Sequence, residues 1–127
     1  MHRSRLAAVV IDSKVDDLDA AAAFWGRALG YAVRPADADD PDYRDLEGPE
    51  EQIRTLLQQV EHPSRVHIDI ETDDIEAEVA RLEKLGAKIV SKLPRWTVME
   101  APTGHRFCVV RPQRPDFATS PDVNVWD

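Results

Sequence analysis

The chain has 127 residues, a formal net charge of −8 and one cysteine. This length corresponds to about one domain, which can fold around its own core without a disulfide or a structural metal. The acidic charge and the even spread of basic residues exclude a typical nucleic-acid-binding protein, and no segment has the ~20 apolar residues needed to cross a membrane. Because the N-terminal sequence becomes charged before a signal-peptide core can form, we expect a cytoplasmic protein.

Two segments of the chain have nearly the same sequence at an offset of 57 positions (66 − 9). Residues 9–20 read VVIDSKVDDLDA, and residues 66–77 read VHIDIETDDIEA. The repeat indicates one supersecondary unit used twice. It also places His67 of the second copy at the position that Val10 occupies in the first copy.

The first copy begins with an apolar strand at 5–12. The pair Asp16 and Asp19 has the spacing of a capping box and predicts the start of a helix. Leu18, Ala22, Trp25 and Leu29 then form one apolar helix face, and Gly30 ends the helix. Turn residues separate three further predicted strands, at about 31–34, 43–47 and 53–60.

The second copy has the same order of elements. A strand at 65–71 leads to the pair Asp73 and Glu76, and a helix follows with Ile75, Val79 and Leu82 on its apolar face and Gly86 at its end. Three strands are predicted at about 87–91, 95–101 and 105–111, with a Pro-Thr-Gly turn before the last. Each copy is therefore predicted to be a β-α-β-β-β unit, with units at about 5–60 and 65–111.

The last residues, 112–127, contain three prolines and few apolar residues, which predicts an irregular C-terminal tail. Phe117 and Trp126 are the residues that could pin this tail to a surface, either of this chain or of a partner.

Strand alternation assigns the side chains of the two first strands to opposite faces. Val66, Ile68 and Ile70 form an apolar set, as do Val9 and Ile11 in the first copy, and we expect this set to pack under the helices. The other set is polar in part and suits the wall of a cleft: it comprises His67, Asp69 and Glu71, with Val10 and Asp12 at the matching positions.

Two such units in tandem, with FWGRALGY in the first, VHIDI and RLEKLGA in the second and a closing APTGHRFCVV, resemble the vicinal oxygen chelate superfamily. More narrowly, the chain resembles the glyoxalase-like domain of the glyoxalase/bleomycin resistance protein/dioxygenase superfamily. The resemblance covers about 5–111. It implies an α+β fold in which the two units form one domain, residues 1–111, around a shared cleft, and it implies a homodimer.

The resemblance also implies where a metal would bind. Enzymes of the superfamily hold a divalent metal with ligands from the first and last strands of each unit, and these positions fall on Val10, Gln58, His67 and Cys108 of this chain. Three of the four depart from the family pattern. Because a catalytic metal normally needs three protein ligands, we expect no metal and no cofactor. The sequence thus predicts a metal-independent protein that binds a small molecule in its cleft, through His67, Gln58, Trp96 and Cys108.

Other interpretations stay open at this point. The chain could be a metal-dependent lyase or isomerase that uses His67 with non-standard ligands such as Asp69 or Asp12, or a metal-free enzyme in which His67 is the base. Cys108 is either a small core residue or a reactive thiol. Trp96 and Gln58 either contact the ligand or fill ordinary strand positions. The sequence does not decide whether the protein is an enzyme.

Overall fold

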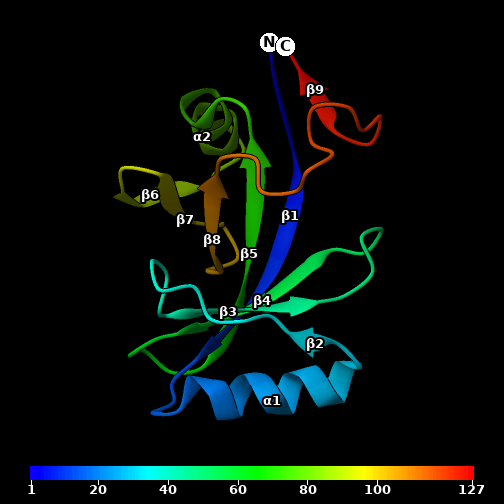
Figure 1. Cartoon of the computed structure of the whole chain (residues 1–127). Helices are drawn as coiled ribbons and strands as arrows, with labels where there is room; N and C mark the ends of the chain where they lie inside the picture. The colour runs from blue at the N-terminus through cyan, green and yellow to red at the C-terminus, as the bar shows by residue number, and fades with distance from the viewer. The chain divides into compact units, whose positions relative to one another are not determined.

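The computed structural model describes residues 1–127 and divides into two compact units. The first-repeat unit is Ala8–Val66, and the second-repeat unit combines Met1–Ala7 with His67–Asp127. Strand β1 (His2–Ser13) therefore contributes residues to both units. Each unit is built from one helix and a mixed sheet (Figure 1), which confirms the predicted α+β fold with two β-α-β-β-β repeats.

In the first-repeat unit, the strand order is β2-β3-β4-β1, and β1 and β4 are parallel. Helix α1 packs on the sheet through the buried side chains of Leu18 and Ala22, which meet Leu46 and Leu57. Trp25 is half-buried against the same core. The elements that follow β1 are α1 (Leu18–Leu29), β2 (Ala32–Val33), β3 (Tyr43–Glu47) and β4 (Arg54–Gln59).

In the second-repeat unit, the order is β5-β8-β7-β6, and β5 and β8 are parallel. Helix α2 covers one face of this sheet, and Val79 and Leu82 of α2 pack on Met99, Phe107 and Val109. The elements are β5 (Arg65–Thr72), α2 (Ile75–Lys84), β6 (Lys88–Lys92), β7 (Trp96–Glu100), β8 (Arg106–Val110) and β9 (Asn124–Trp126). Neither helix of the chain is long and apolar enough to cross a membrane.

Both helices begin one residue later than the capping pattern predicts. The N-caps are Asp17 and Asp74, not Asp16 and Asp73, and their carboxylates accept hydrogen bonds from the backbone N–H groups of Ala20 and Ala77. Each repeat has two consecutive aspartates, so the residue type alone could not choose between them. The carboxylate of Asp73 instead accepts a hydrogen bond from the backbone N–H of Arg3.

The apolar set of β5 is only partly covered. Ile70 packs against the core under α2, but Val66 is 56% exposed and Ile68 is 41% exposed, so the expectation that all three pack under the helix is wrong. The apolar residues of α2 reach only the carboxyl-terminal part of β5. In the same way, Leu29 at the last turn of α1 is 43% exposed and does not extend the apolar face that was predicted for this helix.

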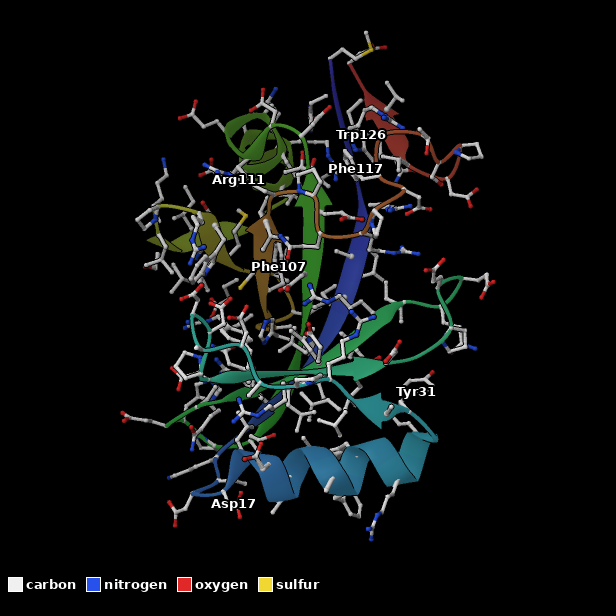
Figure 2. The ribbon with its side chains drawn as sticks, viewed as in Figure 1. Asp17, Tyr31, Phe107, Arg111, Phe117 and Trp126 are labelled. Atoms are coloured by element: carbon white, nitrogen blue, oxygen red, sulfur yellow. The ribbon has the colours of Figure 1, made fainter.

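The segment 112–127, predicted to be irregular, ends in the short strand β9, which pairs antiparallel with His2–Ser4 of β1. Phe117 is buried, with the guanidinium carbons of Arg3 and Arg5 5.5 and 5.8 Å from its ring centre. The indole N–H of Trp126 donates to Ser4, and its ring lies 3.9 Å from the guanidinium carbon of Arg81. Both aromatic residues thus hold this segment against its own unit (Figure 2).

Glu78 on α2 should make the stability of the second-repeat unit fall at acidic pH. Burial of Glu78 would raise its pKa, but hydrogen bonds from Arg81, His2 and Ser4 outweigh this effect and lower the pKa below its ordinary value of 4.5. A lowered carboxyl pKa adds stability above the unfolded-state pKa, and that stability is lost as the pH falls through the folded-state pKa. We therefore expect the stability difference between wild type and Glu78→Gln to shrink below about pH 4.5. Urea unfolding from neutral to acidic pH measures this difference, with Glu83→Gln, at an exposed residue of the same helix, as the control.

Candidate functional site

The face of the second-repeat sheet opposite α2 carries most of the predicted site residues. Directly opposed residues share a face, and the register places Asp69 of β5 beside Cys108 of β8, which in turn lies beside Val98 of β7. One step further along, the register aligns Glu71, Val110 and Trp96. We call this the helix-free face, defined by His67, Asp69, Glu71, Cys108, Val110, Val98 and Trp96.

Three residues with chemically useful groups meet on the helix-free face. The donor atoms of His67, Asp69 and Cys108 all lie within 4.8 Å of one another. Oδ1 of Asp69 lies 3.3 Å from Nε2 of His67, an ion-pair distance without the geometry of a hydrogen bond. The His67 and Asp69 side chains are 11% and 16% exposed. An imidazole, a carboxylate and a thiol are therefore gathered in a largely desolvated position.

One oxygen of this group is poorly satisfied. Oδ1 of Asp69 is buried and receives no hydrogen bond within the chain. Buried acceptors usually have a partner, because leaving one unpaired costs about 1–3 kcal/mol. A buried carboxylate oxygen of this kind is a natural acceptor for a donor group of a ligand, or a ligand atom for a cation.

The C-terminal segment and β1 close one end of the helix-free face at Glu71. The Glu71 side chain is fully buried, and its carboxylate accepts hydrogen bonds from Nε of Arg5 at 2.6 Å and from the backbone N–H groups of Gln113 and Arg114 at 2.6 and 2.9 Å. Arg5 also donates to Asp116, whose pKa is lowered by this hydrogen bond. Glu71 is thus engaged in structure and is not available to a ligand.

The first-repeat unit presents different chemistry at the matching positions. Val10 pairs with Leu56, and Asp12 pairs with Gln58, so Val10 and Gln58 lie on the same face of their own sheet. Val10 is 1% exposed, and Gln58 is half-buried between Asp12 and Tyr43 in the strand register. The Asp12 carboxylate is buried and lies 3.8 Å from His62 and 3.9 Å from Arg65.

The structure thus brings three of the four predicted binding residues, His67, Cys108 and Trp96, onto one face. Gln58 belongs to the other unit. Cys108 is half-buried, so it is not a fully buried core residue. Sequence reasoning named Asp69 only as an alternative metal ligand, although its place two residues after His67 on a strand already put both side chains on the same face.

Trp96 also borders a hollow elsewhere in this unit. A groove of about 840 Å³ lies at the carboxyl ends of β5 and β8, where α2 begins. It is lined by apolar and charged residues, among them Ile75, Glu76, Val79, Leu93, Trp96 and Arg111. None of the three clustered residues His67, Asp69 and Cys108 lines it.

Comparison with known families agrees with this architecture. The sequence model of the glyoxalase-like domain matches residues 8–110, which include both repeats. The chain belongs to the glyoxalase-like domain family. A search of curated protein sequences found no match to the chain.

Solved structures place this glyoxalase-like domain in the vicinal oxygen chelate fold. A hypothetical protein from Bacillus halodurans is 13% identical with a TM-score of 0.60, over 87% of this chain and 95% of that one. A glyoxalase/bleomycin resistance protein/dioxygenase superfamily member from Vibrio splendidus is 17% identical with a TM-score of 0.56, over 86% and 99%. Methylmalonyl-CoA epimerase from Mycobacterium tuberculosis is 21% identical with a TM-score of 0.59, over 91% of each chain. At these identities the likeness establishes the fold alone.

Proposed function

We propose that this glyoxalase-like protein binds a small molecule on the helix-free face of its second-repeat unit, without the metal that enzymes of its superfamily use. The observation that carries the proposal is the side chain at position 10. Where the family resemblance implies a metal ligand, the chain has a valine that is 1% exposed. A valine side chain has no lone pair to offer a metal.

The second family position in the same unit supports this proposal. Gln58 is a neutral amide and a weaker ligand for a divalent metal than a carboxylate. The first-repeat unit therefore does not fit the family's donor set, and a metal held by ligands from both units is not expected.

The helix-free face offers a suitable surface for a small molecule. Trp96, Val98 and Val110 supply an apolar platform, and His67 with Asp69 supplies polar groups beside it. Binding sites for small molecules commonly combine apolar walls with a few polar groups that fix orientation. The expected ligand has an apolar body and at least one hydrogen-bond donor for the buried oxygen of Asp69.

Metal analysis and native mass spectrometry of the protein as purified test this proposal together. We expect less than stoichiometric divalent metal and, where the ligand survives purification, an added organic mass that denaturation releases. One tightly held divalent ion per chain would overturn the metal-independent function.

The cluster of donor atoms favours a second candidate function. His67, Asp69 and Cys108 supply three donors within one unit, the number that a catalytic zinc site normally takes from the protein. Imidazole, thiolate and carboxylate are all zinc ligands, so this donor set fits the ion. A bound zinc would act as a Lewis acid on an oxygen of a substrate, as expected of a lyase or isomerase.

The two candidates differ in what Cys108→Ser does. If the cluster holds zinc, the substitution should weaken zinc binding by at least about 10-fold, because the thiolate is a preferred ligand. It should also remove the rise in melting temperature that added zinc produces. If the protein works without metal, zinc should change the melting temperature of wild type and variant equally.

A further inference from the structure

The outer face of α1 is unusually apolar for a surface helix. Phe24 is 62% exposed, and Ala20, Ala23 and Ala28 are exposed beside it at helical spacing. The charged residues of this 12-residue helix are Asp19 in the first turn and Arg27 in the last turn. The inner face of α1 packs on its own sheet (Figure 1). On the outer face the ring of Phe24 meets the ring of its neighbour Trp25, with centres 5.2 Å apart, but this contact leaves Phe24 mostly exposed.

The repeat supplies an internal comparison for this face. At the offset of 57, Phe24 of α1 corresponds to Arg81 of α2. Arg81 is half-buried, paired with Glu78, and covered by the ring of Trp126 from the C-terminal segment. The chain therefore covers this position in its second copy and leaves an aromatic residue exposed in its first copy.

We propose that the outer face of α1 packs antiparallel against the same face of a second copy of this chain. The positions of the two charged residues of α1 favour a second copy as the partner. In an antiparallel pair related by a two-fold axis at Ala23, Asp19 of each copy lies opposite Arg27 of the other, because both are four residues from Ala23. The same orientation opposes the two helix dipoles.

The side chains of the face also suit this contact. The small side chains of Ala20, Ala23 and Ala28 let the two helices approach closely, while Phe24 fills space beside the two-fold axis. Asp19 already pairs with Arg44 at 2.7 Å, but its side chain is 77% exposed and keeps room for a second cation. A 12-residue helix is only about 18 Å long, so the contact is smaller than a standard interface and the dimer should depend on concentration.

Sedimentation analysis from about 5 μM to about 1 mM tests the contact in the range where modest interfaces associate. The wild-type mass should rise from 14.3 kDa toward twice that value. Phe24→Glu should weaken dimerisation about 10–100-fold, since a large apolar side chain loses its burial and two like charges meet. Circular dichroism checks the fold of the variant, and Ala23→Glu gives a second test at the two-fold axis.

Ala80→Glu is the matched control, because Ala80 is exposed on α2 at the position equivalent to Ala23. It should dimerise like wild type. A wild-type mass of 14.3 kDa at every concentration would overturn the proposal and leave the face to a different partner. A dimer that both α1 variants leave intact would overturn it as well, because the copies would then associate through another surface.

Discussion

Replacing Glu71 by alanine is expected to lower the free energy of unfolding by about 3–5 kcal/mol. The carboxylate is fully buried and accepts hydrogen bonds from Arg5 and from the backbone of Gln113 and Arg114. Its removal leaves the Arg5 guanidinium, 7% exposed, without its buried counter-charge, and leaves two backbone N–H groups unpaired. Because domains of this size are stable by only about 5–15 kcal/mol, the effect is large.

Urea unfolding measures this loss, and limited proteolysis shows where it acts. The segment after β8 should be cleaved faster in Glu71→Ala, since Glu71 holds its first residues. Asp116→Asn is the control: Asp116 also pairs with Arg5 but its side chain is 55% exposed, so the substitution should change stability far less. Equal losses in the two variants would contradict the role given to Glu71.

The local elements of this fold were predictable because their signals are local. Both helices follow from aspartates that precede an apolar 3.6-residue pattern, and all eight strands of the two repeats were placed within a few residues. The errors at the N-caps arise from two adjacent aspartates with equal capping ability. The face that each side chain of β5 takes was also predictable, because alternation along a strand puts His67 and Asp69 on one face.

The remaining features depend on contacts between distant residues. Arg5 and Glu71 are 66 positions apart, and Ser4 and Trp126 are 122 apart. No periodicity in the sequence predicts such pairs. For the same reason the sequence could not decide whether Cys108 is a core residue or a site residue. Its closeness to His67 and Asp69 follows from the pairing of β5 with β8, which only the structure shows.

His67→Ala should have the largest effect on binding. A panel of metabolites, ranked by the rise in melting temperature that each produces, supplies the probe, because a ligand that binds only the folded state stabilises it. Loss of the imidazole removes a polar contact and leaves the buried oxygen of Asp69 further from any donor. We expect the best ligand of the panel to bind about 10–100-fold more weakly, as measured by calorimetry.

His105→Ala is the matched control, since His105 is exposed beside the turn and bonds Thr103. It should bind the same ligand with unchanged affinity. Repeating the titration with a chelator separates the two candidate functions: affinity that persists supports binding by His67 and Asp69 themselves, whereas affinity that is lost assigns the ligand to a metal on the three-residue cluster. If His67→Ala binds as tightly as His105→Ala, with or without chelator, the ligand does not bind at His67. The groove at the start of α2, which Trp96 borders, is then the next surface to test.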